Sequence, residues 1–390
     1  MVTSRLRLPT PDSFTSRLRS PAVAARVGLW LGLCFATCFV TGLVSHYAQQ
    51  PTHPIPFPTS PSWGYRLTQG LHVTTGVAAI PLLLVKLWSV LPRLFEAPPL
   101  GDPRRLLLTA LERGSIAVLV AASVFQLATG LLNAAQWYPW TTFSFRTTHY
   151  ALAWIAIGAL LVHVAVKLPL IRDVLARDID DTAHDRPGAR EAGALSRRAL
   201  VRTTFAAAGV AVLATAGGTV PWLRRVSVFA TRTGEGPGGV PINKSATAAG
   251  VEESATSPDW RLEVVVGGTV AAVLSLDDLR AMPQHTVDLP IACVEGWSAQ
   301  GTWSGVRLVD LLRSAGARAG DVVVTSLQRA GAFRRTTLPA NFAADARTLV
   351  ALDLAGEPLA LDHGFPCRLI APDRPGVLQT KWLARLEVDG

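Results

Sequence analysis

Five stretches of the chain are apolar and free of Asp, Glu, Lys and Arg over about 20 residues, the length that a helix needs to cross a bilayer. They lie at residues 27–45, 67–85, 116–135, 147–166 and 203–223. The first stretch lacks the small-residue cleavage site of a signal peptide, and four more follow it. The pattern therefore predicts a resident membrane protein with five transmembrane helices.

After the fifth stretch the pattern changes twice. Residues 224–258 are rich in Gly, Pro, Ser, Thr and Ala, which is typical of a linker. Alternating apolar and polar residues then predict a hairpin of strands 261–266 and 269–274, a helix over 276–281 capped by Ser275, and a helix over 306–315. Further strands are expected at 322–327, 348–354, 367–370 and 383–388.

The predicted fold class is multi-domain: an all-α transmembrane bundle of five spans followed by a C-terminal mixed α+β domain. The expected division is a cytoplasmic tail (1–26), a four-helix domain (27–170), a cytoplasmic loop (171–195), a signal-like segment with the fifth helix (196–223), a linker (224–258) and an outer domain (259–390).

Arginines give the orientation, because basic residues in short loops stay on the cytoplasmic side. Five lie in the 1–26 tail, four in residues 93–113 and six in residues 172–198, whereas the two opposite connections hold only Arg66 and Arg146. Those connections also carry the aromatic residues of an interfacial belt, namely Trp63, Tyr65, Trp137, Tyr138 and Trp140. We therefore expect the N-terminus inside and residues 224–390 outside a bacterial plasma membrane.

Composition excludes several other classes of protein. A hydrophobic content of 49% excludes disorder, and four cysteines in 390 residues exclude a disulfide-stapled module. The net charge of +9 comes from arginines that cluster beside apolar stretches, so we do not expect nucleic-acid binding. Cys34 and Cys38, four residues apart in the first apolar stretch, are interpreted as packing residues.

Histidines inside the apolar stretches are the first candidate site, since ionisable groups in hydrocarbon need a partner. His72 and His149 lie near the outer ends of their helices, where two imidazoles can ligate a haem iron from opposite faces. His163 follows His149 by 14 residues, on nearly the same helix face and roughly 21 Å deeper. The position 14 residues after His72 is Lys86, so one outer haem is expected.

Two interpretations of these histidines stay open. In one they are hydrogen-bonded within the bundle and carry nothing, and His46 is an ordinary interfacial residue. In the other, the small residues Gly70, Gly76 and Gly130 make room for a macrocycle. Residues 25–170 resemble the four-helix membrane b-type cytochromes that relay electrons for periplasmic oxidoreductases, and this resemblance implies haem b.

The fifth stretch follows the sequence Ser196-Arg197-Arg198-Ala199-Leu200-Val201-Arg202 and is only weakly hydrophobic. This order resembles the twin-arginine export signal, whereas a plain positive-inside flank predicts only arginines. The resemblance implies the twin-arginine translocase as a partner, a folded outer domain loaded with its cofactor before export, and a helix retained as an anchor.

The chemistry of the outer domain is expected at Pro290-Ile291-Ala292-Cys293-Val294-Glu295-Gly296-Trp297-Ser298. A strand that ends in a lone cysteine and breaks at a glycine places a thiol at a strand terminus, where sites are commonly built. From the residues alone, Cys293 is also compatible with a buried structural thiol.

With Trp303-Ser304-Gly305-Val306 and the helix that follows, this segment resembles the molybdenum-ligand segment of the sulfite oxidase family, which includes bacterial periplasmic methionine-sulfoxide reductase subunits. The resemblance implies that Cys293 binds molybdenum beside the dithiolene of one molybdopterin. It also assigns the pterin-binding residues His363, Arg368, Lys381 and Asn243. The sequence departs from the family at Ile291-Ala292, where an Arg is usual, and at Asp373-Arg374-Pro375, where an aromatic residue is usual.

These features predict a membrane-anchored molybdopterin oxidoreductase that transfers an oxygen atom to or from a sulfite-type or sulfoxide-type substrate. Arg334 and Arg374 are the expected cationic residues for the substrate, together with Cys293 as the catalytic thiolate. His72, His149 and one b haem are expected to exchange electrons with the quinone pool or a redox partner. The alternatives are a metal-free electron-transfer or anchoring protein and a thiol catalyst at Cys293.

Overall fold

The computed structural model describes residues 9–52, 55–139, 143–230, 236–318 and 320–389. Three residues used in the orientation argument, Arg5, Arg7 and Trp140, lie outside these ranges. The chain forms two compact units, one of Met1–Val40 and His72–Thr215 and one of Thr41–Leu71 and Ala216–Gly390.

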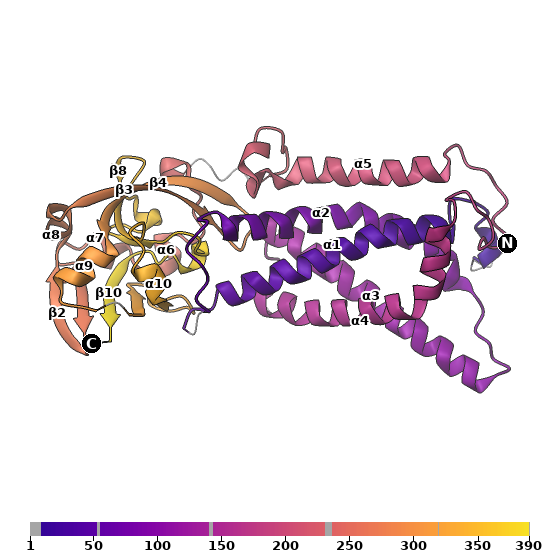
Figure 1. Ribbon diagram of the computed structural model, residues 1–390, viewed down its shortest axis with the longest axis horizontal. Coiled ribbons are helices and arrows are strands. Elements are labelled where there is room, and N and C mark those ends of the chain that lie inside the picture. The colour runs from indigo at the N-terminus through magenta and orange to yellow at the C-terminus, as the bar shows by residue number, and fades with distance from the viewer. Residues whose placement is uncertain (1–8, 53–54, 140–142, 231–235, 319, 390) are drawn as a thin grey trace, which may run out of the picture. The chain divides into compact units, whose positions relative to one another are not determined.

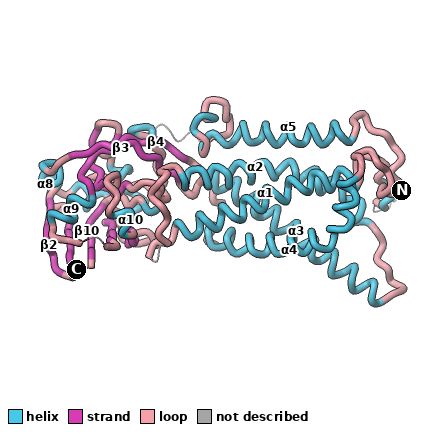
Figure 2. The backbone as a smooth tube through the Cα atoms, in the orientation of Figure 1, coloured by secondary structure: helices cyan, strands magenta, loops and turns pink. Residues whose placement is uncertain are grey.

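The first unit is helical (Figures 1 and 2). Among the described residues, five helices are long and apolar enough to cross a membrane, which confirms the predicted number of spans. They are α1 (Pro21–Ala48), α2 (Gly64–Val90), α3 (Pro103–Ala134), α4 (Phe145–Ala176) and α5 (Arg197–Thr215). Helix α3 begins earlier than its apolar stretch because Asp102 accepts hydrogen bonds from the backbone N–H groups of Arg104 and Arg105.

Helix α5 ends at Thr215, eight residues before the expected boundary, and continues as a short 3-10 turn over Ala216–Gly218. Gly217 explains part of this difference. A Cβ atom at Gly217 would lie 2.5 Å from Ser227 Cβ, so the returning chain packs against the glycine backbone.

Side-chain contacts hold the bundle of the first unit together. Cys38 Sγ lies 3.2 Å from Thr75 Oγ1 between α1 and α2, and both Cys34 and Cys38 are free cysteines. Gln126 of α3 donates to the backbone carbonyl of His149 in α4 at 2.7 Å, and Lys167 of α4 pairs with Glu112 of α3. Trp30 of α1 contacts Phe205 of α5 edge-to-face.

The second unit carries the strands (Figure 2). One sheet has the order β2-β1-β10-β5-β6, with β1 and β10 parallel, and the other has the order β3-β4-β7-β8, with β9 added on β7. The strands are β1 (Leu262–Val266), β2 (Thr269–Leu274), β3 (Gln284–Ala292), β4 (Ser298–Arg307), β5 (Val322–Ser326), β6 (Arg335–Leu338), β7 (Leu349–Leu354), β8 (Glu357–Pro358), β9 (Arg368–Ile370) and β10 (Leu383–Val388).

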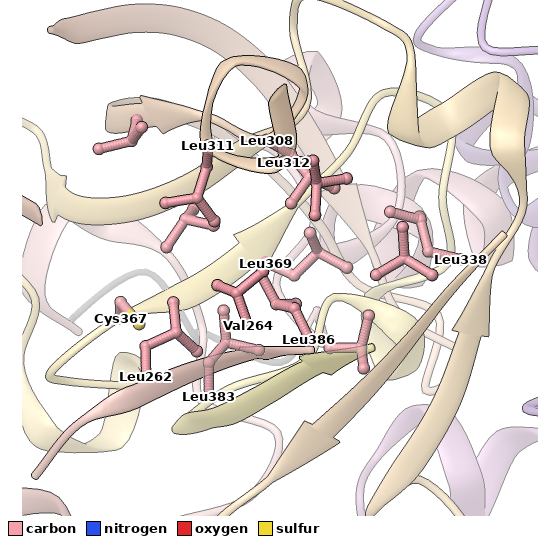
Figure 3. Packing of buried hydrophobic residues seen from close by; sticks show 14 of the residues in the cluster. Leu262, Val264, Leu308, Leu311, Leu312, Leu338, Cys367, Leu369, Leu383 and Leu386 are labelled. Carbon is pink, nitrogen blue, oxygen red and sulfur yellow. The ribbon is translucent and has the colours of Figure 1, made fainter. Parts of the chain in front are cut away.

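Short helices complete the mixed α+β domain and its core. They are α6 (Ala246–Ala249), α7 (Glu252–Thr256), α8 (Leu276–Ala281), α9 (Leu308–Ser314) and α10 (Ala340–Ala343). Leu308, Leu311 and Leu312 of α9 pack into the main buried cluster with residues from both sheets, such as Leu369 and Leu386 (Figure 3). A second buried cluster, which includes Leu289 and Ile291 of β3 and Ile370 of β9, positions the two strands beside the candidate site.

The observed elements match the sequence prediction closely in the hairpin, in α8 with its Ser275 cap, and in β10. Two expectations were wrong. The helix predicted over 306–315 begins only at Leu308, because residues 298–307 form the long strand β4, in which Trp303 is fully buried. Within the expected linker, α6 and α7 are ordered, because Ala246, Val251 and Ala255 pack against Trp382.

Candidate functional site

Cys293 lies immediately after β3, in the tight connection to β4. Its backbone N–H donates to the Trp297 carbonyl at 2.9 Å, and the Gly296 N–H donates to the Cys293 carbonyl at 3.0 Å. Gly296 has a φ of 84°, a conformation that favours glycine and explains why the turn contains one. The paired strands β3 and β4 thus hold the thiol at a strand terminus, as the sequence predicts.

The Cys293 thiol is buried, with 1% of its surface exposed, and its Sγ lies 3.7 Å from Glu295 Oε2. Glu295 also accepts a hydrogen bond from Trp297 Nε1 at 2.9 Å. Burial, followed by the negative charge of Glu295, raises the pKa of Cys293 well above the ordinary range. The thiolate therefore requires a cation to stabilise it, which argues against a free thiol nucleophile.

No group of three or more His, Cys, Asp or Glu side chains arranged for a metal ion occurs in the described part of the chain. Cys293 therefore fits a metal only together with ligands that a cofactor brings. In such a site the protein would supply one thiolate, and the dithiolene of an organic cofactor would supply the other sulfur ligands.

A group of basic side chains, here called the basic cradle, consists of His363, Arg368 and Lys381. Arg368, in β9, donates to the His363 carbonyl at 2.9 Å and to the Gln379 carbonyl at 3.1 Å. Lys381 Nζ donates to the carbonyls of Lys244 and Asp362. His363 Nε2 lies 2.8 Å from the Val240 carbonyl. Three segments distant in sequence thus meet in one place.

Gly364 makes this meeting possible. Its φ is 110°, and a Cβ atom there would lie 3.0 Å from Lys381 Cβ and 3.1 Å from Arg368 Cβ. A side chain at this position would push the two basic stems apart.

Asp362 lies within electrostatic reach of Lys381 and His363, but it forms no ion pair with the basic cradle. Neither Arg368 nor Lys381 forms an ion pair among the residues described here, and both are buried. Burial lowers the pKa of Arg368 to about 9, and burial followed by the charge of Arg368 lowers the pKa of Lys381 to about 7. An anion bound here would remove that penalty.

Two nitrogens of the cradle also lack a partner. His363 Nδ1 and Arg368 Nε are buried and form no hydrogen bond within the described ranges. Buried polar atoms are normally satisfied, so such atoms indicate a ligand or water. Together with two buried cations, they fit the phosphate and polar edge of molybdopterin.

The other predicted outer-domain residues are placed differently. Arg374 is buried and donates to the carbonyls of Leu378 and Thr337, both at 3.1 Å, so its guanidinium is largely occupied by backbone. Burial lowers its pKa to about 9. Arg334 is exposed in the turn before β6. Asn243 is half-buried and precedes Lys244, whose carbonyl contacts Lys381.

Sequence reasoning missed several residues that support the site. The Arg368 guanidinium lies 5.0 Å from the centre of the Trp303 ring. Gln379, whose carbonyl accepts a hydrogen bond from Arg368, is buried. Thr219 donates to the Gly296 carbonyl, and Arg224 donates to the Ser298 carbonyl at 3.2 Å, so the segment after α5 contacts the loop that follows Cys293. Only the aromatic pattern around Trp303 gave a signal for any of them.

In the first unit, the structure brings His72 and His149 together. Their ring centroids are 6.3 Å apart and their planes are inclined by 59°. His149 Nδ1 lies 3.1 Å from Thr129 Oγ1, and that hydroxyl donates to the Phe125 carbonyl at 2.7 Å. The Thr129 oxygen therefore accepts from His149 Nδ1–H, which leaves Nε2 of His149 as the nitrogen with a lone pair. His163 instead lies within electrostatic reach of Lys86, Lys167 and Glu112.

Comparison with known proteins identifies the C-terminal domain. The family model described as oxidoreductase molybdopterin-binding domain matches residues 248–390. The uncharacterized oxidoreductase YuiH of Bacillus subtilis (strain 168) is 30% identical over 167 residues, which cover 40% of this chain and 82% of YuiH. The chain belongs to the molybdopterin-binding oxidoreductase family.

Other members of this family match over a smaller part of their length. Mitochondrial sulfite oxidase of Drosophila melanogaster is 32% identical over 33% of this chain and 27% of that protein. The putative protein-methionine-sulfoxide reductase subunit YedZ1 of Azospira oryzae (strain ATCC BAA-33 / DSM 13638 / PS) is 34% identical over 33% of this chain and 48% of YedZ1. This chain thus spans less than a third of the Drosophila sulfite oxidase.

A solved structure, the sulfane dehydrogenase SoxCD from Paracoccus pantotrophus, aligns with a TM-score of 0.31 and 23% identity over 34% of this chain and 38% of that chain. The family assignment therefore depends on the sequence matches. It gives this chain a molybdopterin-binding oxidoreductase domain over residues 248–390, and the described residues before it include five helices long and apolar enough to cross a membrane.

Proposed function

We propose that this protein is a membrane-anchored molybdopterin oxidoreductase that acts outside the cytoplasm by oxygen-atom transfer on a sulfite-type or sulfoxide-type substrate. His72 and His149 would hold a b haem in the helical unit, which would supply one-electron exchange with the membrane quinone pool. The observation that carries the proposal is the buried Cys293 thiol in the same domain as a basic cradle whose buried Arg368 and Lys381 form no ion pair within the described residues.

The bound molybdenum cofactor supplies a two-electron redox centre for oxygen-atom transfer. Cys293 provides one protein thiolate to the metal, and the turn at Gly296 fixes the direction of that sulfur. Arg368 and Lys381 neutralise the pterin phosphate, with Arg as a planar donor and Lys as a point charge. His363, through Nδ1, and Asn243 contact the polar edge of the pterin. Arg334 and Arg374 are the cationic residues proposed for the substrate oxygen.

The haem proposal is supported by the spacing of His72 and His149. Their ring centroids are 6.3 Å apart, so the two imidazoles would be the residues that hold a haem iron. The hydrogen bond to Thr129 orients the His149 ring, as outer partners commonly do for metal-ligating histidines.

The location outside the cytoplasm is supported by the distribution of arginines between the connections. Export by the twin-arginine translocase is supported by the sequence from Ser196 to Arg202. That pathway suits a domain that must receive its cofactor in the cytoplasm.

Combined molybdenum and haem analysis tests the proposal on purified wild type, Cys293→Ser and Cys367→Ser. Cys367 is the matched control, because it is an equally buried free thiol that lies in the hydrophobic core. We expect about one molybdenum and one haem per chain in wild type, loss of turnover with retained haem in Cys293→Ser, and retained molybdenum in Cys367→Ser. Wild-type protein without molybdenum would support the metal-free alternative, and turnover by Cys293→Ser would refute the assigned ligand.

A further inference from the structure

The connection between α1 and α2 lies against the molybdopterin-binding domain, and both belong to one compact unit. Residues 55–66 are here called the docking segment. Asn341 of α10 donates to the Phe57 carbonyl at 2.8 Å, and Arg347 donates to the Thr59 carbonyl at 3.1 Å and to Ser60 Oγ at 3.0 Å. The Phe57 ring packs against the main core cluster of the domain.

The docking segment ends in the first turn of α2, which the domain caps. Asp373 Oδ1 accepts a hydrogen bond from the Tyr65 backbone N–H at 2.5 Å, and the Gly64 N–H, which donates to the Pro61 carbonyl at 3.0 Å, lies near this carboxylate. A Cβ atom at Gly64 would lie 3.0 Å from both carboxylate oxygens of Asp373. The first N–H groups of a helix have no partner within the helix, and a carboxylate is the acceptor they favour.

The backbone of residues 374–376 connects Asp373 to β3, the strand that precedes Cys293. Its own φ is 54°, in the left-handed region that Asp tolerates better than most residues. Arg374 follows, and its guanidinium is anchored on Leu378 and Thr337. Gly376 then packs on Ala292, because a Cβ atom there would lie 3.1 Å from the Ala292 carbonyl oxygen. Ala292 precedes Cys293.

We propose that Asp373 is a positioning residue that caps the first turn of α2 and thereby holds the turn Asp373–Gly376, which supports the Cys293 strand, against the docking segment. The partner surface is the docking segment of the same chain. Asp373 falls at a position where the sequence departs from the sulfite oxidase pattern, so this contact gives that departure a structural reason. The consequence for electron exchange depends on the proposed function, whereas the capping contact does not.

Hydrogen–deuterium exchange on the full chain in nanodiscs tests the contact directly. In Asp373→Ala, we expect the amides of residues 64–66 to exchange roughly tenfold faster, the scale set by loss of a helix cap. In Asp373→Asn, one acceptor oxygen remains and protection is largely restored. Asp278→Ala is the matched control, because Asp278 is also a helix-capping carboxylate, on α8, and does not contact the docking segment. Unchanged exchange at 64–66 in Asp373→Ala would overturn the proposal.

A variant in the docking segment tests the same contact without changing the molybdopterin-binding domain, so that misfolding of the domain does not explain the result. Gly64→Ala inserts a methyl group against the Asp373 carboxylate, and we expect the same faster exchange at 64–66. Gly32→Ala in α1 is its control, because no atom lies within 4 Å of a Cβ at Gly32. Protection equal to wild type in Gly64→Ala would show that the two groups are not in contact and would also overturn the proposal.

Two measurements test the positioning role. One is the rate at which the haem absorption changes after substrate is added, and the other is the electron paramagnetic resonance spectrum of molybdenum. We expect Asp373→Ala to slow the haem change about tenfold and to alter the molybdenum signal, with partial recovery in Asp373→Asn. Faster amide exchange with both readouts unchanged would leave Asp373 a purely structural cap and refute the positioning role. If purified wild-type protein contains no haem or no molybdenum, the proposed function is refuted. The hydrogen–deuterium exchange experiment would still test the capping contact.

Discussion

At the residue scale, the basic cradle keeps two cations in a place where water cannot solvate them. Lys381 shows the consequence most clearly, because burial and the neighbouring Arg368 both disfavour its charged form. Its hydrogen bonds to two backbone carbonyls hold the ammonium group in position. The side chain is therefore prepared for an anion at a cost to the stability of the cofactor-free protein.

This cost predicts a pH dependence for the cofactor-free protein. The pKa of Lys381 is about 7 when folded, against 10.5 for an ordinary lysine, so between these values the unfolded chain binds a proton that the folded chain does not. Stability then rises with pH across that range. We expect the Tm of wild type, followed by tryptophan fluorescence, to rise from pH 7 to 9 relative to that of Lys381→Met. Pyrophosphate should reduce this difference by favouring the charged lysine, and parallel pH profiles would contradict the assignment.

Individual residues also show what sequence alone could supply for the site. Cys293 was predictable because a strand, a glycine and an aromatic loop surround it in one short motif. The proposed roles of Arg368 and Lys381 came from resemblance, since nothing in a linear sequence shows that two basic residues 13 positions apart are buried together and form no ion pair. The hydrogen bonds to the carbonyls of Lys244, Asp362 and Gln379 could not be predicted from the sequence, because every residue has a backbone carbonyl.

At the element scale, apolar length predicted the five helices well and their ends poorly. Helix ends depend on capping and on tertiary packing, as Asp102 at α3 and Gly217 after α5 show. The strand β4 was missed because its alternation is interrupted by Gly301 and Gly305, and Gly305 is required by the close approach of Val350 from β7. The pairing of β4 with β3 and β7 therefore determines that residues 298–307 form a strand, which the local sequence pattern did not predict.

Helices α3 and α4 together orient the candidate haem ligand, and this pairing can be tested. Thr129→Val removes the acceptor of His149 Nδ1–H while preserving the shape of the side chain. We expect haem to be retained at lower affinity, by roughly 10- to 100-fold as for other outer partners of metal ligands, with a shifted midpoint potential. Haem titration and potentiometry provide the measurements.

Thr204→Val in α5 is the control for that variant. Thr204 is also a buried threonine that donates to a backbone carbonyl, that of Leu200, but no histidine contacts it in the described contacts. Equal haem affinity in wild type and Thr129→Val would show that the Thr129 hydroxyl does not orient the ligand. Loss of haem in both variants would indicate a general effect on the bundle.

At the scale of the whole molecule, one chain joins apolar helices long enough to cross a membrane to a molybdopterin-binding domain. The proposed export requires that the cofactor be inserted before this domain crosses the membrane. The segment that resembles a twin-arginine signal lies between these two parts in the sequence, and the structure gives its arginines a structural role. Arg197 is buried, pairs with Asp185 and donates to the carbonyls of Arg17, Ile179 and Asp181. Arg198 pairs with Asp178 at 2.7 Å. Loss of export in an arginine variant thus has two possible causes, a lost signal or a disrupted loop.

Two variants separate these causes. Arg197→Lys with Arg198→Lys keeps the positive charges but removes the guanidinium groups, so we expect residues 224–390 to stay in the cytoplasm, protected from protease added outside spheroplasts. Asp185→Asn breaks the same buried ion pair and leaves the signal sequence intact, so we expect normal export of a domain that contains molybdenum. Normal export of the double lysine variant would refute the signal. Failure of both variants would instead assign Arg197 a structural role, because removal of either partner of a buried pair is strongly destabilising.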